Sequence, residues 1–421
     1  MPAKTPEDLK QAFETLLDIP NIEIEKVEID REVNYIVTVG STEKGTTCHE
    51  CGRDVDKAHG YDRMMTLRHL SILDRDVYIR IRLPRYRCPY CDGHPTTTQN
   101  PSWHERGSSH TRAFEQRILL ACVNSTVWDV SMKEGVGYGA VEGIINRHID
   151  TEVDWSKIVV LDIIGLDEIS LKKGHKDFVV IVTGRVGNET RILAVLKDRT
   201  KATVKEFLLS MPKRLRRKVQ AVCSDMYDGF ISAAKEVFGK KVRIVVDRFH
   251  VAKLYRNGVE TLRKRELRRL KNELSSEAYK ELEGAMWILR KREDDLTEDE
   301  RKVRDKLFEY SPQLKEAYTF SNELTAIFDL DIDKRRGKLR LTGWIRRVKS
   351  RKLDCFNTFI KTLEKYKDEI GNYFVNHHNS GFVEGLNNKI KVIKRRCYGI
   401  LNINHLFQRI YLDLSGYSLY A

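Results

Sequence analysis

The chain has 421 residues, and 41% of them are apolar. A chain of this length can form two or three domains, each with its own hydrophobic core. The formal net charge of +14 and the pI of about 9.2 are typical of proteins that bind polyanions. No apolar run approaches the roughly 18 residues that a membrane span needs, and no secretory signal sequence is evident. The composition therefore excludes an integral membrane protein and predicts a soluble, intracellular one.

The N-terminal region is predicted to combine a helix with strands. An amphipathic helix is expected over residues 5–18, with Thr5 as its cap. Its apolar face would comprise Leu9, Phe13, Leu16 and Leu17. Alternating apolar residues predict strands between 22 and 39, and a further strand is predicted at 77–83. In that strand apolar residues alternate with Tyr78, Arg80 and Arg82, so one face is apolar and the other basic.

Two Cys-x-x-Cys pairs indicate a zinc site formed by Cys48, Cys51, Cys88 and Cys91. Thirty-six residues separate the second and third cysteines, so a hairpin must project from the site. The alternative is four unrelated buried cysteines. Nearby histidines could replace a ligand or support one, but are more simply surface residues; they are His49, His59, His94 and His104. The other cysteines, namely Cys122, Cys223, Cys355 and Cys397, are expected to pack in cores.

Three helices are predicted next, at about 111–124, 126–134 and 139–149. A Gly-rich turn separates the last two, and the apolar positions could form the small shared core of a helix-turn-helix unit. Those positions are Ile118, Leu119, Val127, Val130, Val141, Ile144, Ile145 and Ile149. The third helix is the better candidate for the DNA major groove.

The remainder of the chain changes from strands to helices. Strands are predicted at 158–166, 178–183, 192–196, 221–223 and 242–246, with helices at 201–213 and 228–238. The resulting order is β-β-β-α-β-α-β. Residues 252–373 are rich in Lys, Arg, Glu and Leu and are predicted to be helical, and a last helical pattern starts at Gly381.

Carboxylates follow three of the apolar strands. Asp167, Asp225 and Asp247 are expected at strand ends, where neighbouring acids can share a hard divalent cation. Glu384 opens a helix that continues with basic residues, namely Lys389, Lys391, Lys394, Arg395 and Arg396. Strand-end acids and solvated basic helices are common, so these features alone do not establish a site. Together they suggest a phosphate backbone held against metal ions.

At these residues the chain resembles the transposases of the ISL-three family of bacterial insertion sequences. The resemblance rests on motifs that follow one another in order along the chain: Gly165–Ser170 with Lys172–His175, Ser224–Tyr227, Asp247–Val251, Asn379–Gly385 and Lys391–Gly399. It implies an α/β fold with an RNase H-like catalytic core, in which Asp167, Asp225 and Glu384 form the catalytic triad. It also implies that Asp247 and His250 correspond to the family's D-x-x-H signature and that 252–373 is a helical insertion.

The resemblance also implies a division into segments. These are a zinc-binding DNA-recognition domain (1–105), a helix-turn-helix domain (106–153), the first part of the catalytic core (154–251), the helical insertion (252–375) and the final core helices (376–421). The expected activity is binding of the terminal inverted repeats, followed by metal-dependent DNA cleavage and strand transfer. The alternatives are an RNase H-like structure-specific DNA nuclease and a domesticated zinc-dependent DNA-binding regulator.

The implied activity specifies cofactors and partners. Two Mg²⁺ or Mn²⁺ ions would be held by the triad, and one structural Zn²⁺ by the cysteines. The partner would be double-stranded DNA, both transposon ends and target, bound by a homodimer or larger assembly in the bacterial cytoplasm, with no membrane involved. Expected DNA contacts are Arg80, Arg82, Asn146, Arg147, Lys389, Lys391, Lys394, Arg395 and Arg396.

Overall fold

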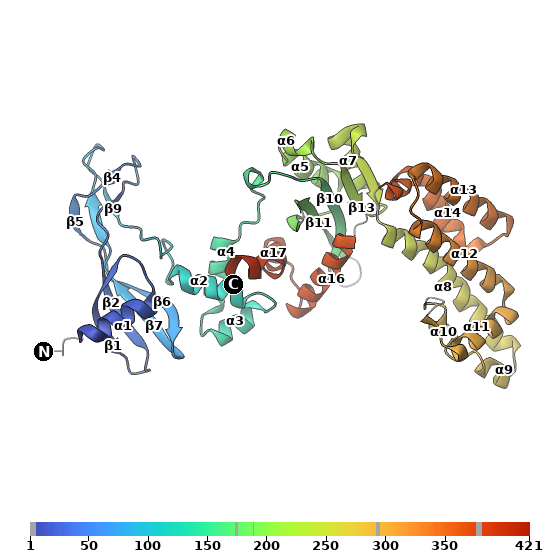
Figure 1. Ribbon diagram of the computed structural model, residues 1–421, viewed down its shortest axis with the longest axis horizontal. Helices are drawn as coiled ribbons and strands as arrows, with labels where there is room; N and C mark the ends of the chain where they lie inside the picture. Colours follow the sequence, from blue (N-terminus) through green and yellow to red (C-terminus); the bar gives the residue numbers. More distant parts are fainter. Residues whose placement is uncertain (1–5, 173–175, 188, 292–294, 376–380) are drawn as a thin grey trace. The chain divides into compact units, whose positions relative to one another are not determined.

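The structure is a computed structural model, and it describes residues 6–172, 176–187, 189–291, 295–375 and 381–421. The chain forms two compact units, Met1–Asp150 with Tyr411–Ala421 and Thr151–Ile410 (Figure 1). Within the described residues, no helix is both long enough and apolar enough to cross a membrane.

The N-terminal unit starts with helix α1 (Glu7–Leu17), which packs on a four-stranded sheet of order β1-β2-β7-β6. Its strands are β1 (Ile22–Ile29), β2 (Tyr35–Ser41), β6 (Met65–Ile72) and β7 (Arg75–Ile81). The predicted helix is confirmed, with Phe13 and Leu17 buried, but the assignment of Leu9 and Leu16 to the same face is wrong because both are exposed. The N-cap residue is Pro6. Thr5, the expected cap, lies outside the described residues.

Strand β7 has the predicted two-faced character. Its apolar positions Val77, Ile79 and Ile81 are fully buried in the core of this sheet, whereas Arg80 and the following Arg82 are exposed. Because successive side chains of a strand point to opposite faces, the basic face is turned to solvent.

Within the N-terminal unit, the cysteines lie among five short strands that we call the cysteine subdomain: β3 (Thr46–Thr47), β4 (Asp54–Val55), β5 (Ala58–Tyr61), β8 (Pro84–Arg87) and β9 (Thr96–Thr98). β3 pairs with β4, and β8 lies between β5 and β9. The β6–β7 hairpin leaves the cysteine subdomain between the two cysteine pairs, as predicted. It joins β1 and β2 through the parallel pairing of β2 with β7.

The helix-turn-helix prediction is confirmed by α2 (Arg112–Ala121), α3 (Val127–Lys133) and α4 (Tyr138–His148). The Thr111 and Thr126 hydroxyls accept hydrogen bonds from the first turns of α2 and α3, which fixes where both helices begin. The predicted core positions are buried except Val127, which is half-buried.

The second unit contains a five-stranded sheet of order β12-β11-β10-β13-β14. Its strands are β10 (Ile163–Lys172), β11 (Lys176–Val186), β12 (Glu189–Leu196), β13 (Ala221–Ser224) and β14 (Arg243–Val246). The first three are antiparallel neighbours, and β13 and β14 run parallel to β10. The connecting helices are α5 (Lys201–Ser210), α6 (Lys213–Arg216) and α7 (Asp228–Phe238). The predicted β-β-β-α-β-α-β order is confirmed.

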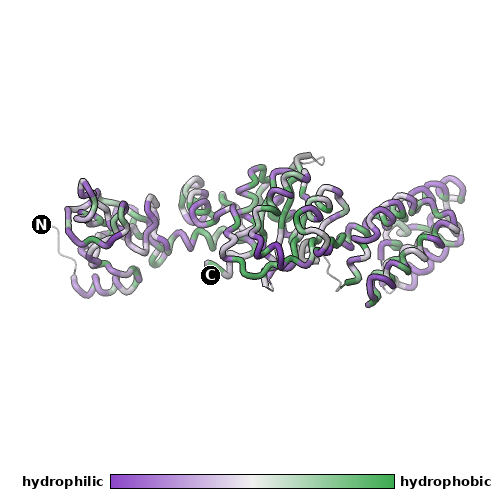
Figure 2. Tube along the Cα trace, turned by 90° about the horizontal axis from the view of Figure 1, so that it is seen from above, coloured by the Kyte–Doolittle hydropathy of each residue, from purple (hydrophilic) through white to green (hydrophobic). Residues whose placement is uncertain are grey.

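The region after β14 is helical, as predicted, with no strand among its described residues. Its helices are α8 (Arg248–Glu273), α9 (Ser276–Lys280), α10 (Ala285–Ile288), α11 (Glu298–Tyr310), α12 (Pro312–Asp329), α13 (Lys334–Ser350), α14 (Asn357–Lys365) and α15 (Lys367–Gly371). Trp344 lies at their centre with edge-on contacts to Phe356 and Phe359. Figure 2 shows hydrophilic residues alternating with hydrophobic ones along these helices, as expected for helices that bury one side.

Two helices complete the chain, α16 (Gly381–Arg396) and α17 (Ile403–Tyr420). In α16, Ile390 and Ile393 are fully buried. The last residues of α17 belong to the N-terminal unit, where the Asp413 carboxylate accepts a hydrogen bond from the Asn124 backbone at 2.9 Å.

Candidate active site, zinc centre and DNA-binding residues

Three aspartates occupy equivalent positions on three adjacent strands. In the parallel register of the sheet, Leu166 of β10 pairs with Ser224 of β13, and Ser224 pairs with Val246 of β14. Asp167 is the next residue of β10, and Asp225 and Asp247 directly follow the ends of β13 and β14, so the three residues are neighbours in the register of the sheet. The expectation that Asp167 ends its strand is wrong, because pairing with β11 extends β10 to Lys172.

The Asp225 carboxyl is in an environment that disfavours its negative charge. Burial raises its pKa to about 7, and the charges of Asp167 and Glu168 act in the same direction, against the positive charges of His250 and Arg199. Its Oδ1 atom is buried and has no hydrogen-bond partner among the described residues. A buried carboxylate oxygen that faces other acids fits a hard cation such as Mg²⁺.

The aspartates do not form a complete metal site by themselves. Of the described residues, only the four cysteines bring three or more ligand atoms within 4.8 Å of one another. A third carboxylate would therefore have to join Asp167 and Asp225.

Asp247 and His250 lie at the start of α8. Asp247 caps the helix by accepting a hydrogen bond from the Phe249 backbone at 2.8 Å. His250 Nδ1 lies 3.6 Å from Asp247 Oδ2. The structure therefore brings this predicted pair together beside Asp225. The charge of His250 partly offsets the rise in the pKa of Asp225 that burial causes.

Arg199 is a site residue that the sequence analysis missed. Its Nη1 atom donates to Glu168 Oε2 at 2.8 Å, and its guanidinium lies over the rings of Phe178 and Tyr227, at 4.6 and 5.2 Å from their centres. Its charge also lowers the pKa of Asp225. The only signal in the sequence was its position shortly after a strand, which was too weak to single it out.

Glu384 is the fourth residue of α16, and its side chain lies outside what the structure describes, as do motif residues 173–175 and 379–380. On the same helix, the Lys394 ammonium donates to the Ser170 carbonyl of β10. The structure therefore places the helix that carries Glu384 against the strand that carries Asp167.

The remaining basic residues of α16 differ in exposure. Lys391 and Arg395 are exposed, whereas Lys389, Lys394 and Arg396 are half-buried. Burial lowers the pKa of Lys394. The two exposed residues are therefore the more accessible to a phosphate backbone.

The four predicted cysteines meet at one point. The Sγ atoms of Cys48 and Cys91 are 3.9 Å apart, and those of Cys51 and Cys88 are 3.7 Å apart. Backbone N–H groups of Cys51 and Glu50 lower the pKa of Cys48 to about 6, and contact with the other thiols raises that of Cys91. Four sulfur atoms at this spacing fit a tetrahedral zinc ion, which would stabilise all four as thiolates.

None of the four nearby histidines belongs to this cluster of ligand atoms. His49, His59 and His94 are exposed, as expected. The expectation is wrong for His104, which is buried and hydrogen-bonds to the Ser108 carbonyl at 2.9 Å.

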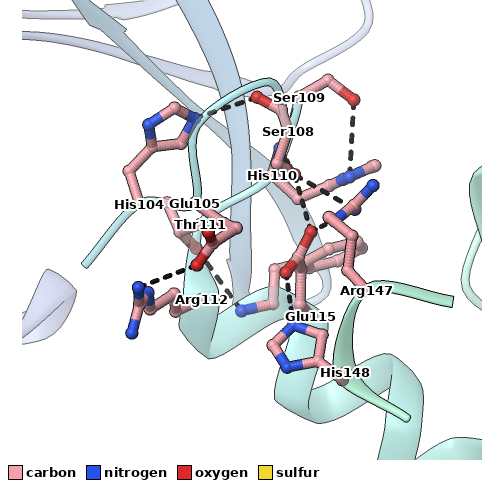
Figure 3. A network of polar contacts seen from close by, with 11 residues as sticks. His104, Glu105, Ser108, Ser109, His110, Thr111, Arg112, Glu115, Arg147 and His148 are labelled. Atoms are coloured by element: carbon pink, nitrogen blue, oxygen red, sulfur yellow. Dashed lines mark hydrogen bonds and ion pairs between the residues drawn. The ribbon is translucent and has the colours of Figure 1, made fainter. Parts of the chain in front are cut away.

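The helix-turn-helix unit contains a buried acid, Glu115 of α2, with three polar partners (Figure 3). Ser108 Oγ donates to it and His148 Nε2 contacts it, each at 2.6 Å, and Arg147 forms an ion pair with it. Although burial opposes the charged form, these partners lower the pKa of Glu115 to about 2. Arg147, an expected DNA contact, thus joins α4 to α2, and both it and the neighbouring Asn146 are exposed.

Comparison with known proteins finds matches to transposase families along most of the chain. A family model described as a transposase matches residues 164–410. Models for the zinc-finger of transposases IS204, IS1001, IS1096 and IS1165 and for the helix-turn-helix domain of transposase family ISL3 match residues 44–91 and 98–149.

Two curated relatives are similar over most of their length. The transposase for insertion sequence element IS1001 of Bordetella parapertussis is 24% identical over 93% of this chain and 95% of its own. The transposase for insertion sequence element IS1557 of Mycobacterium tuberculosis is 24% identical over 95% of this chain and 93% of its own. The zinc-finger, helix-turn-helix and transposase matches follow one another in chain order, and the chain therefore belongs to the ISL3 (ISL-three) family of DNA transposases.

Proposed function

We propose that Asp167, Asp225 and Glu384 are the catalytic carboxylates of this transposase, within an RNase H-like core. The observation that carries the proposal is the register of Asp167 beside Asp225, where the pKa of the Asp225 carboxyl is raised to about 7 and its Oδ1 has no described partner. The contact of α16 with β10 supports Glu384 as the third member.

Two Mg²⁺ or Mn²⁺ ions would be held by these carboxylates. When bound, such ions activate the attacking water or 3′-hydroxyl and stabilise the leaving oxygen. The chain's own contribution is to fix Asp167 and Asp225 side by side at the sheet, with the Asp167 side chain and Asp225 Oδ1 buried. The charges of His250 and Arg199 act against the burial of Asp225 and favour its carboxylate form, and Asp247 lies beside His250 at the start of α8.

The DNA would be held outside this row by basic residues. Arg80, Arg82, Lys391 and Arg395 are exposed and suit contacts with phosphates, and exposed Asn146 of α4 suits a base edge. Arg147, Lys389, Lys394 and Arg396 make contacts within the protein, and DNA contact by these four residues is also part of the proposal.

The other parts of the chain would support end recognition and synapsis. Cys48, Cys51, Cys88 and Cys91 would hold one structural Zn²⁺. Residues 1–105 and 106–153 would form the two DNA-recognition domains. The core would comprise 154–251 and 376–421, interrupted by the insertion at 252–375. Because two transposon ends must be brought together, the active form on double-stranded DNA would be a homodimer or larger, acting in the bacterial cytoplasm.

A joining assay tests this proposal. The full chain is incubated with duplex DNA that carries its element's end and flanking sequence, with Mg²⁺ or Mn²⁺, and with a precut end that has a free 3′-hydroxyl. We expect metal-dependent cleavage of the first substrate and joining of the second to target DNA. Cleavage without any joining would instead identify a nuclease.

A further inference from the structure

Helix α13 of the insertion is unusual in its charge. Between Lys334 and Ser350 it contains no acidic residue and eight basic ones, namely Lys334, Arg335, Arg336, Lys338, Arg340, Arg346, Arg347 and Lys349. The preceding helices α11 and α12, by contrast, mix both signs. A solvated helix face normally carries interspersed charges, so α13 needs a separate explanation.

The basic residues fall into two groups according to their partners. Five form ion pairs within the insertion: Lys334 and Lys338 with Asp368, Arg336 with Asp333, Arg347 with Glu323 of α12, and Lys349 with Glu364 at 2.8 Å. The other three, Arg335, Arg340 and Arg346, form no ion pair or side-chain hydrogen bond with any described residue.

Arg335 and Arg346 lie on the side of α13 that is turned away from the protein. The buried positions of the helix, among them Leu341, Trp344 and Val348, fix the opposite side as the outer one. Residues 335, 339, 343, 346 and 350 follow at helical spacing along this outer side. We call these five positions the outer stripe of α13; its Leu339 is 72% exposed.

Gly343 is at the middle of the outer stripe. A Cβ atom added there would meet no atom within 4 Å, so no packing contact requires glycine. Gly337 on the buried side differs, because its added Cβ would lie 2.3 Å from the Phe374 ring. Glycine inside an exposed helix lowers its stability, and it also allows another molecule to approach the backbone closely.

We propose that the outer stripe of α13 binds the phosphate backbone of duplex DNA. Guanidinium groups match phosphate geometry, and Arg335 and Arg346 are about 16 Å apart along the helix axis, far enough to contact separate phosphates. Gly343 between them lets the backbone of the DNA approach, and Leu339 can pack against sugar. The contact carries no sequence information. The inference rests on the transposase function and adds a DNA-binding surface to those proposed on the two recognition domains and on α16.

The test compares two charge-matched double variants of the full chain. Arg335→Gln/Arg346→Gln removes two positive charges from the outer stripe, and Lys302→Gln/Lys315→Gln removes two from exposed positions on α11 and α12. Binding to a duplex that carries the element's end and flanking DNA is measured between 50 and 200 mM salt, a range over which phosphate contacts weaken strongly. Wild-type cleavage of the same DNA is confirmed first, so that failure of the transposase activity itself is seen separately.

We expect the stripe variant to lose about tenfold or more in affinity at low salt and to lower the slope of log K against log salt by about two, one unit per phosphate contact. The control should change little. Equal effects of both variants, or no effect of the first, would overturn the proposal, as would a changed oligomeric state with unchanged DNA affinity, which would identify a protein interface.

Substitutions of Gly343 give an independent readout. Gly343→Ala should raise the thermal stability and leave DNA binding nearly intact, whereas Gly343→Glu should weaken DNA binding well beyond Gly343→Gln, which has a similar size but no charge. If Gly343→Glu and Gly343→Gln bind DNA equally well, the stripe does not face phosphate.

Discussion

Asp167 and Asp225 lie on adjacent parallel strands one residue beyond the paired Leu166 and Ser224, and the charge of Asp167 contributes to the raised pKa of Asp225. Two acids held this way repel each other unless a cation lies between them. In the metal-free protein, this repulsion is expected to lower the free energy of unfolding as the pH rises and both carboxyls become charged.

In EDTA, the folded protein binds a proton at Asp225 more tightly than the unfolded chain does, because the pKa is about 7 when folded and near 4 when unfolded. The resulting contribution to the free energy of unfolding is fully present below about pH 4 and is lost as the pH rises through about 7. The melting temperature of the wild type should thus fall more between pH 5 and 8 than that of Asp225→Asn. Mg²⁺ should restore the wild type at pH 8 and have little effect on the variant. Identical pH profiles for the two proteins would contradict the electrostatic account.

Arg199 is predicted to be a positioning residue. Arg199→Gln removes a charge that lowers the pKa of Asp225, so at pH 7 the variant should need several-fold more Mg²⁺ for half-maximal cleavage, and higher pH should relieve the defect. DNA binding should be unchanged. Arg191→Gln, which breaks an exposed pair with Glu189 on β12, is the control. A defect in Arg199→Gln that ignores both pH and Mg²⁺ would indicate a purely structural role.

The zinc centre is predicted to hold about one zinc ion per chain. Cys88→Ser should lose the metal and unfold the cysteine subdomain, because structural zinc contributes directly to folding. Elemental analysis of the purified protein measures this, with Cys397→Ser as the control that keeps its zinc. Zinc content unaffected by Cys88→Ser would refute the assignment.

The Glu115 network is expected to determine the stability of the helix-turn-helix unit. Glu115→Gln leaves Arg147 and His148 without their buried acid, and should cost about 2–4 kcal/mol. Since the pKa of Glu115 is lowered to about 2, its stabilisation is present above pH 4.5 and lost as the pH falls toward 2. Hydrogen exchange of α2 and α4 amides reports the loss. Glu105→Gln, in an exposed pair with Arg112, should cost less than about 1 kcal/mol.

The periodicity of apolar residues was sufficient to predict the order of strands and helices along the core and the three helices of the helix-turn-helix unit, and composition was sufficient to predict the helical region 252–373. Contacts between distant segments were not predictable in this way. Pairing with β11 carries β10 past Asp167. The sequence carries no signal for the buried Glu115 network, because the partners Arg147 and His148 lie some thirty residues away along the chain. Likewise, Arg199 acquires its role only when the fold brings Glu168 and two aromatic rings around it.

Two acids close to the triad, Asp228 and Glu168, are unsuitable as control positions because both have partners in the fold. Asp228 accepts hydrogen bonds from Lys365 and from the Tyr366 hydroxyl, the latter at 2.8 Å, and thereby ties α7 to the insertion. Glu168 pairs with Arg199. Neither is a simple surface acid, so a neutral control is better taken from α5, where Glu206 is exposed.

The most direct measurement is the activity of the three amide variants Asp167→Asn, Asp225→Asn and Glu384→Gln on DNA that carries the element's end. Each keeps the size of the side chain but removes a charge that holds the metal ions, so cleavage and joining should fall on the order of 10³-fold or more. End binding should be nearly intact, and Glu206→Gln should be as active as the wild type. Full cleavage by Glu384→Gln would show that the third carboxylate lies elsewhere, and full cleavage by Asp167→Asn or Asp225→Asn would contradict the proposed site itself.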